Sequence, residues 1–569
     1  MRAAAGRDQR GSFLSRSTQA LGAVARNRDL RRAEGAFALF IAAEHGSWVA
    51  ILVYAYLQGG SAEAGIAAFV QLLPAALLAP LAGAAADRLG AARMLVGGYA
   101  AQAVAMGLTG AALAAGAAAW VTYTVAAVAA VTVTATRPTQ AVLTPALARS
   151  PVELGAVNVL SGWITAGGGL VAPALAGLLV AISSPSVAFF AAAVATAGAT
   201  ALALRIPRSP APVEAGNPVR RAFADIAEGL GVIRRHRPVR LVIALVGALF
   251  VLVGAVDILA VVLALGKLHL GRGGSGYLSA SFGAGGIAGA ALSVTLIGRR
   301  RLAPHVVAAA LACGLALVLL GLWTTTVAAF VLFTLAGAGR IVFDVAAQTL
   351  LQRAAPSHVL SRIFAVAEAL AMAGLAVGSL AVPALVALGG IRVALIGVAA
   401  LLPLVIVLRL RALIAIDDSA TVPVVEISLL RNMRLFALLP PPALEGLAHA
   451  LTPVELPPGT DVIVQGDEGD RMYAIADGAV DIIASGRFVT TLERGEAFGE
   501  IALLYDIPRT ATVRTRTGVR LYALERDAFL VALTGHATTH VAAQGLVDER
   551  LLELQALRDE ELGVAEPLP

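Results

Sequence analysis

The chain has 569 residues, of which 58% are hydrophobic and only 14% are charged, and its mean hydropathy is +0.81. Soluble proteins carry about 25% charged residues, so the excess apolar side chains are expected to face lipid. Because Cys313 is the single cysteine, an intrachain disulfide is excluded, and with it the cysteine-rich secreted class.

The formal net charge of +6 combines two unlike parts of the chain. Residues 1–411 hold 31 Lys and Arg against 13 Asp and Glu, a net +18, whereas residues 412–569 hold 12 against 24, a net −12. In the first part the arginines stand at the ends of apolar runs, which indicates membrane topology. We therefore expect a membrane domain in contact with the lipid bilayer, then a soluble domain, and no nucleic-acid partner.

The first 34 residues are polar, hold eight arginines and lack the apolar core of a signal peptide. From Gly35 to Leu410 follow twelve apolar runs of about 20 residues, the length that a helix needs to span a bilayer. The first six are 35–57, 63–85, 92–115, 118–136, 156–181 and 186–204, and the second six are 240–265, 275–297, 303–323, 326–348, 363–388 and 391–410. A Pro-rich, then basic and helix-compatible loop separates the two sets. This layout predicts an all-α bundle of twelve spans in two six-helix halves.

Basic residues set the expected orientation of these spans. Arginines crowd into the N-terminal tail and the even-numbered connections, whereas the odd-numbered connections hold only Lys267, Arg272 and Arg392. Since cytoplasmic loops are enriched in Lys and Arg, both termini are predicted to be cytoplasmic, in a multi-pass protein of the inner (plasma) membrane.

A charged loop after the second run reads GAAADRLGAAR, residues 83–93. It resembles the loop signature of the major facilitator superfamily, which has Gly, three residues, Asp, a basic residue, one residue, Gly and then basic residues. Ala91 and Ala92 depart from the expected basic pair. The resemblance implies that Asp87 and Arg88 gate an alternating-access cycle. The alternative is that they only cap a helix at the membrane surface.

The fifth run contains GGGLVAPALAG, residues 167–177. This segment resembles the Gly/Pro-rich element of facilitator-type exporters and favours efflux of a small molecule as the activity. Small residues also let helix backbones approach closely in any bundle, so ordinary packing is the alternative.

Charged side chains inside the apolar runs mark the expected transport path, because each is costly in lipid. Arg340 and Asp344 are four residues apart on a helix and form either a neutralised structural pair or part of the substrate site. Glu44 and Asp257 either carry coupling protons or are merely solvated. The full set of candidates is Glu44 beside His45 in the first run, Asp257 in the seventh, Arg340 and Asp344 in the tenth, and Glu368 in the eleventh.

After Arg411 the composition becomes that of a soluble α+β domain. Short Gly-punctuated strands such as DVIVQG and RMYAIADG, between helix-compatible segments, predict a small β-barrel or jelly roll. The expected segments of the whole chain are the tail 1–34, the first half-bundle 35–205, the central loop 206–238, the second half-bundle 239–411, a linker 412–424, the soluble domain 425–540, and a C-terminal helix and tail 541–569.

The sharpest motif is GEAFGEIALLYDIPRTATV, from Gly495 to Val513. It closely resembles the phosphate-binding cassette of cyclic-nucleotide-binding domains, and the resemblance covers about residues 425–555. It implies cyclic AMP or cyclic GMP as a regulatory ligand rather than a cofactor. It also implies that the C-terminal helix covers the base. The matching turn glycines are Gly459, Gly466 and Gly478, and the expected base contacts are Leu546, Leu551, Leu552 and Leu554.

The residue types of this cassette suit a cyclic nucleotide. Gly499 lets the backbone approach the ligand, and a short helix beginning there directs N–H groups near Ile501 and Ala502 at an anion. Arg509 offers a cationic fork to the phosphate oxygens, and Glu500 can accept a hydrogen bond from the ribose 2′-hydroxyl. The alternative is a surface ion pair on a vestigial fold.

Thr510 does not decide whether the nucleotide base is adenine or guanine. In the family that the cassette resembles, a hydroxyl at this position can contact guanine, but cyclic-AMP binders with threonine also exist.

Two functions are weighed for the whole chain, a transporter regulated by cyclic nucleotide and a membrane-anchored sensor that no longer transports. The charges within the spans favour transport. The sequence contains no Walker loop, metal cluster or nucleophile elbow, so we expect neither an enzyme nor a metal site, and nucleotide acts as a signal.

Overall fold

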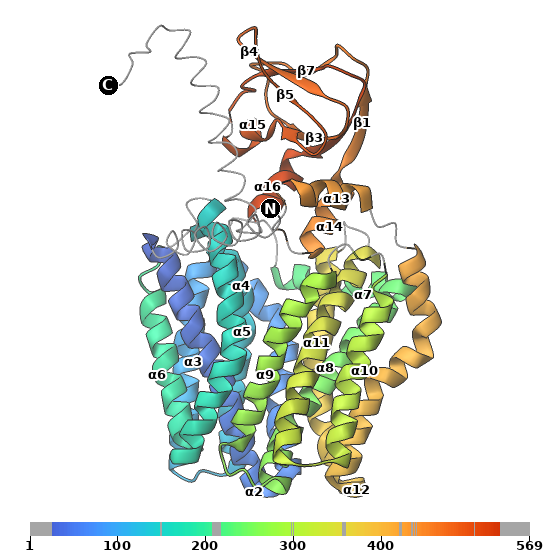
Figure 1. The fold of residues 1–569 in the computed structure, drawn as a ribbon. Helices are drawn as coiled ribbons and strands as arrows, with labels where there is room; N and C mark the ends of the chain where they lie inside the picture. Colours follow the sequence, from blue (N-terminus) through green and yellow to red (C-terminus); the bar gives the residue numbers. More distant parts are fainter. Residues whose placement is uncertain are drawn as a thin grey trace, which may run out of the picture. The chain divides into compact units, whose positions relative to one another are not determined.

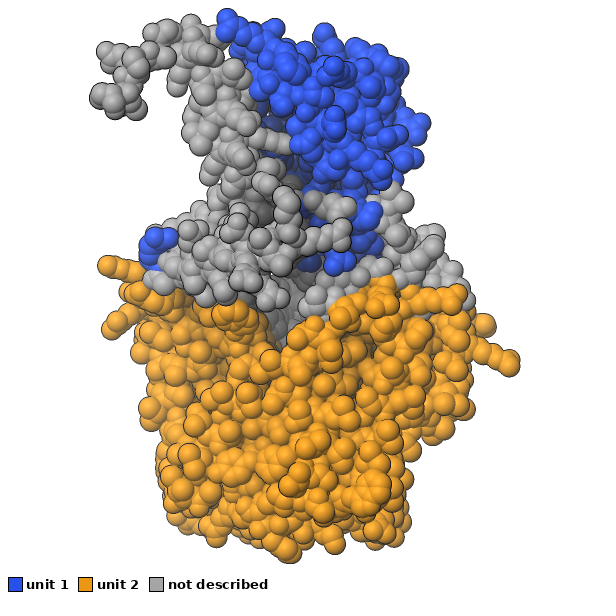
Figure 2. Space-filling view, in the orientation of Figure 1, with its two compact units in different colours: residues 1–27, 148–159, 421–569 blue, residues 28–147, 160–420 orange. Residues whose placement is uncertain are grey.

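A computed structural model of the chain describes residues 26–147, 151–207, 218–296, 299, 301–354, 360–419, 424–433, 436, 439, 441–505 and 507–534. The chain divides into two compact units, coloured separately in Figure 2. The helical unit comprises residues 28–147 and 160–420, and the sheet unit comprises residues 421–569 with the short segments 1–27 and 148–159.

The helical unit is a bundle of long helices (Figure 1). Among the described residues, eight helical stretches are long and apolar enough to cross a membrane. The helices are α2 (Arg28–Leu89), α3 (Ala91–Ala114), α4 (Ala119–Leu147), α5 (Pro151–Ile182), α6 (Pro185–Ala203), α7 (Pro218–Arg235), α8 (Arg237–Val261), α9 (Gly274–Ser293), α10 (Ala303–Leu322), α11 (Thr326–Ala354) and α12 (Leu360–Ser419). A π-helical segment, Val262–Lys267, extends α8, and a 3-10 turn, Val294–Leu296, ends α9.

Glycine pairs break the two longest helices. The backbone leaves the helical region at Gly59–Gly60 in α2 and at Gly389–Gly390 in α12. The φ angles of Gly60 and Gly390 are 68° and 75°, in the left-handed region that glycine enters without a steric cost. Each long element is therefore two apolar helices in succession, and the breaks fall between the first and second and between the eleventh and twelfth expected runs.

The helices pack in two groups. In one group α2 contacts α4 and α6, and α3 contacts the same two helices; in the other, α8 contacts α12, α9 contacts α11, and α10 contacts α11 and α12. Contacts between α2 and α12 join the groups. Large apolar side chains lie on the outer surface, such as Val194, Val327 and Leu388, which are 72%, 75% and 80% exposed. An apolar outer surface of this kind suits a lipid environment.

The first and last helices of the bundle extend beyond their expected limits. Helix α2 begins at Arg28, inside the expected tail 1–34, because Leu30 and Ala33 are buried and draw this stretch into the bundle. Residues 412–419, expected to begin a linker, instead continue α12, since Leu413 and Ile416 are 1% and 6% exposed and keep one helix face in the core. The helix expected in the central loop is α7.

The sheet unit is built of antiparallel strands (Figure 1). One sheet has the strand order β1-β8-β3-β6 and the other β2-β7-β4-β5, and Ile475, Phe498, Val513 and Leu521 belong to the core of the unit. The elements are α13 (Val424–Asn432), α14 (Pro441–Ala450), β1 (Thr452–Leu456), β2 (Asp461–Ile463), β3 (Arg471–Asp477), β4 (Val480–Ala484), β5 (Arg487–Leu492), β6 (Ala497–Phe498), α15 (Glu500–Tyr505), β7 (Thr512–Thr515), β8 (Val519–Glu525) and α16 (Arg526–Thr534). The expected C-terminal helix, with Leu546, Leu551, Leu552 and Leu554, lies outside the described residues.

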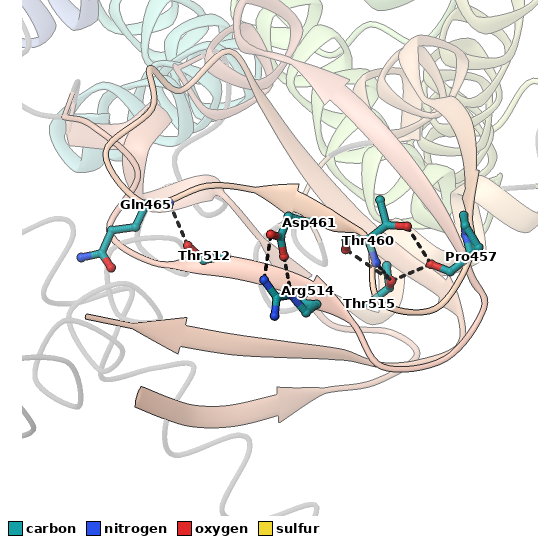
Figure 3. A network of polar contacts seen from close by, with 7 residues as sticks. All are labelled: Pro457, Thr460, Asp461, Gln465, Thr512, Arg514 and Thr515. Carbon is teal, nitrogen blue, oxygen red and sulfur yellow. Dashed lines mark hydrogen bonds and ion pairs between the residues drawn. The ribbon is translucent and has the colours of Figure 1, made fainter. Parts of the chain in front are cut away.

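A network of polar contacts joins β2 to β7 (Figure 3). The Thr515 hydroxyl, in a side chain that is almost fully buried, accepts a hydrogen bond from the Thr460 N–H at 2.8 Å and donates to the Pro457 carbonyl at 2.7 Å. Arg514 donates to both carboxylate oxygens of Asp461, at 2.6 and 2.9 Å, and these hydrogen bonds hold the pKa of Asp461 below its ordinary value. The Arg514–Asp461 pair stabilises the folded state fully at pH values above about 4, the pKa of an aspartate in the unfolded chain. This contribution is lost as the pH falls through the lowered pKa of Asp461 in the folded state.

Replacing Thr515 by valine should destabilise the sheet unit by about 1–3 kcal/mol, because two backbone groups lose a buried partner. The measurement is the free energy of unfolding of residues 424–569 in denaturant. Thr460→Val is the matched control: its hydroxyl donates to the same Pro457 carbonyl, at 3.0 Å, but in an exposed bond. The control should stay within about 0.5 kcal/mol of the wild type. Equal effects of the two changes would contradict the role given to Thr515.

Candidate functional site

The nucleotide cassette begins where β6 gives way to α15. Gly499 has a φ of 86°, and a Cβ atom here would lie 2.8 Å from Nη1 of Arg509 and 3.1 Å from the Arg471 carbonyl oxygen. Glycine is therefore required both by the backbone conformation and by the close approach of Arg509. Ile501 and Ala502 fall in the first turn of α15, where backbone N–H groups have no acceptor within the helix.

The side chain of Arg509 is held in one orientation next to Gly499. Its side chain is only 4% exposed. Nη1 donates to the Gly499 carbonyl at 2.9 Å, and Nη2 donates to the Arg471 carbonyl at 2.7 Å and to the Asp470 carboxylate at 3.2 Å. Burial lowers the pKa of Arg509 from its ordinary value, while Asp470 acts in the opposite direction. Arginine remains charged at neutral pH, so a fixed cation lies beside the N-terminus of α15.

The remaining cassette residues directly follow Gly499 or Arg509 in the chain. Glu500 is fully buried, Ile501 and Ala502 are 7% and 2% exposed, and Thr510 is half-buried next to Arg509. The structure thus brings together the six residues that the sequence analysis selected, and a fixed guanidinium with backbone donors is suited to an anionic ligand.

One loop of this site was missed by the sequence analysis. Asp470 pairs with Arg509, and Gly469 lies so close to α15 that a Cβ there would come within 2.7 Å of the Ala502 Cβ. The segment GDEGD directly before β3 was an available signal, since an acidic loop between a turn glycine and a strand is a plausible partner for a buried arginine. Asp470 and Arg509 are 39 positions apart in the sequence, so no local sequence pattern predicts that they pair.

In the helical unit, two of the candidate carboxylates have partners on other helices. Glu44 on α2 accepts a hydrogen bond from Nη2 of Arg137 on α4 at 2.8 Å, and Asp257 on α8 accepts one from Nε1 of Trp48 on α2 at 3.1 Å. Arg137 follows the expected run 118–136 and so falls in a predicted connection, but α4 continues past it to Leu147. His45 contacts the Ile41 carbonyl at 3.0 Å, one turn back on its own helix.

The other candidate charges continue this arrangement. Arg340 on α11 interacts electrostatically with both Asp257 and Asp344. Glu368 on α12 is exposed and interacts with Arg137 and with Asp344. The charges therefore form one connected series that runs from α2 and α4 in the first group of helices to α8, α11 and α12 in the second.

Asp87 and Arg88 lie in the last turn of α2, before Gly90 makes the turn to α3 with a φ of 80°. Their side chains lie outside the described residues, so their gating role stays a prediction.

The Gly/Pro-rich segment of α5 is a contact surface. A Cβ on Gly177 would lie 2.6 Å from the Gly273 carbonyl oxygen and 3.1 Å from the Gly276 Cα, and a Cβ on Gly283 would overlap the Gly169 carbonyl. The backbones of α5 and α9 therefore approach each other closely at this segment, as small residues allow, and its interpretation as an exporter element stays a prediction.

Two family models match the chain. The family model of the Major Facilitator Superfamily matches residues 35–370, and that of the cyclic nucleotide-binding domain matches residues 453–536. The chain therefore belongs to the major facilitator superfamily. It carries a cyclic nucleotide-binding domain after its transporter domain.

Three solved structures are similar to parts of the chain. The regulatory domain of Toxoplasma gondii PKA, co-crystallised with cAMP, is 32% identical with a TM-score of 0.20, over 20% of this chain and 46% of that one. The regulatory subunit of a cAMP-independent protein kinase A from Trypanosoma brucei is 32% identical with a TM-score of 0.20, over 21% and 44%. The sensor domain of the transcriptional regulator DNR from Pseudomonas aeruginosa is 24% identical with a TM-score of 0.21, over 22% and 92%. The chain spans less than half the length of the first two.

Proposed function

We propose that this protein is a secondary active transporter that exports a small molecule and is regulated by cyclic AMP or cyclic GMP. The observation that carries the proposal is the joining of a membrane transporter domain to a cassette in which Arg509, Gly499 and the start of α15 converge. The non-transporting sensor is disfavoured, because a sensor has no use for a series of costly charges that continues between the two groups of helices.

We further propose twelve membrane spans with both termini in the cytoplasm. Of the eight apolar stretches, two divide at glycine pairs, and α4 and α9 add the remaining spans. Basic residues in the even-numbered connections support the orientation and an inner-membrane location. The two antiparallel sheets are consistent with a jelly roll.

Transport and its regulation are tested together in proteoliposomes that contain the full-length protein. A panel of small molecules is screened for flux with and without saturating cyclic AMP or cyclic GMP. A ligand shifts a conformational equilibrium only by its difference in affinity for the two states. Allosteric couplings are typically about 1–3 kcal/mol, so nucleotide should change flux several-fold.

Arg509→Ala in the same proteoliposomes is the control and should transport without responding to nucleotide. If no compound is transported while nucleotide still binds, the sensor function is favoured. If the wild type transports at the same rate with and without nucleotide, the two domains are tethered but not coupled.

A further inference from the structure

Glu34 is a carboxyl group that the proposed transport path does not use. It lies on the first part of α2 and is only 3% exposed. Apolar neighbours on α2, Ala33, Ala36, Phe37 and Phe40, are buried in one cluster with residues of α3, α4 and α6. An ionised carboxylate in such surroundings costs several kcal/mol unless it is paired or fully hydrogen-bonded.

The hydrogen bonds of Glu34 are incomplete for a carboxylate. The Ser161 hydroxyl on α5 donates to Oε2 at 2.7 Å, a short and well-formed bond. The Gln140 amide nitrogen on α4 lies 3.4 Å from Oε1, beyond the usual range, and is shared with the Ala33 carbonyl at the same distance. One good donor is little compensation for a full negative charge.

Two residues that interact with Glu34 have buried polar atoms without partners. Oε1 of Gln140, in a residue 4% exposed, and the hydroxyl of Tyr99, in a residue 0% exposed, have no hydrogen-bond partner among the described atoms. Tyr99 lies on α3, packs against Phe40 with ring centroids 5.8 Å apart, and interacts electrostatically with Glu34. A protonated Glu34 carries an O–H donor, which a carboxylate lacks, and acceptors without partners favour the form that can donate.

Two described arginines on helices around Glu34, Arg32 and Arg137, pair with other carboxylates. Among the described residues, no Lys or Arg lies within ion-pair distance of Glu34. On its own helix Arg32 pairs with Asp29 and donates to the carbonyl of Arg205, which follows α6. On α4 Arg137 pairs with Glu44. Helix α3 contributes the Tyr99 phenol, and α5 contributes the neutral Ser161. Glu34 thus differs from Glu44 and Asp257, which accept N–H donors and interact with arginines.

We propose that Glu34 is a proton-binding site, protonated while α2, α4 and α5 pack around it and deprotonated when movement of α4 or α5 admits water. On release, the carboxyl O–H bond breaks, the proton passes to water as hydronium, and Glu34 is left as a carboxylate. The inference rests on the proposed transport function and adds to it the coupling ion, H⁺, and the residue that carries it.

Infrared spectroscopy of the full-length protein in liposomes at pH 7 tests the site without any transported compound. The C=O stretching band of a protonated carboxylic acid should be present and should be lost in Glu34→Gln, an isosteric change that keeps the hydrogen bond from Ser161. Glu44→Gln is the matched control on the same helix and should leave the band unchanged, since Glu44 is paired with Arg137. Ser161→Ala should move the band to higher frequency, because the acceptor oxygen loses its donor.

A band that survives Glu34→Gln, or the absence of any such band, would overturn the proton site. The coupling is tested next by imposing a pH gradient on flux, which should accelerate the wild type several-fold and leave Glu34→Gln unaffected. An infrared band that depends on Glu34, with flux indifferent to the gradient, would overturn the coupling role alone. Because the infrared result does not depend on flux, failure of the transport proposal is distinguishable from failure of the site.

Discussion

Replacing Arg509 by alanine is expected to weaken cyclic-nucleotide binding by residues 424–569 at least a hundredfold. Hydrogen bonds to charged groups contribute about 1.5–3 kcal/mol each. Two such bonds from the guanidinium fork to a phosphate amount to roughly 3–6 kcal/mol, at about 1.4 kcal/mol for each tenfold change in Kd. The cation is already fixed by the carbonyls of Gly499 and Arg471, so little rotamer entropy is lost on binding. Calorimetry with cyclic AMP and cyclic GMP measures the effect.

Two further variants separate the phosphate contact from other effects. Arg509→Lys keeps the charge but not the planar fork, so its affinity should fall between those of the wild type and the alanine variant. Arg514→Ala removes an exposed arginine on β7 that pairs with Asp461, and it should leave Kd within about twofold. Thermal unfolding of each variant shows whether the protein remains folded. Failure of the wild type to bind either nucleotide would overturn the proposed regulation.

The cassette could be predicted from the sequence because its chemistry is local. A run of eleven residues contains Gly499, the helix that starts at Glu500, and Arg509. The sequence of that run is enough to predict a glycine with a positive φ followed by a short helix. The partner of Arg509 could not be predicted in the same way. Asp470 reaches it only because the loop before β3 packs against α15, and that contact is set by the sheets as a whole.

The membrane charges show the same limit. Glu44, Asp257 and Arg340 were recognised because a charge within an apolar run is conspicuous. Arg137 was not, because the following Pro138 indicates a helix end, whereas α4 continues through it. Its pairing with Glu44 spans 93 positions. Glu34 falls in the predicted polar tail 1–34, and only the buried side chains at the start of α2 reveal that this stretch belongs to the bundle.

Replacing Gly177 by valine is expected to reduce flux roughly tenfold or more. The new Cβ would meet the Gly273 carbonyl oxygen at 2.6 Å and the Gly276 Cα at 3.1 Å, and both are backbone atoms that no rotamer change can move away. Helices α5 and α9 must then separate. Overpacking typically costs about 1–3 kcal/mol, which lowers the population of this packing by roughly five- to 150-fold. Since α5 comes from the first expected half-bundle and α9 from the second, the change disfavours the conformation in which the two helices meet here.

Gly167→Val is the matched control, because it makes the same substitution on the same helix at a position where a Cβ would meet nothing within 4 Å. The difference between the two variants therefore isolates the contact with α9 from any change in helix propensity. Spin labels on cysteines introduced at Ser183, which follows α5, and at the exposed Arg272, which precedes α9, report the separation of these two helix ends in a Cys313→Ser background. We expect Gly177→Val to lengthen that distance and lower flux together, and Gly167→Val to change neither. If Gly177→Val transports like the control, the α5–α9 contact is not one that the transport cycle must form.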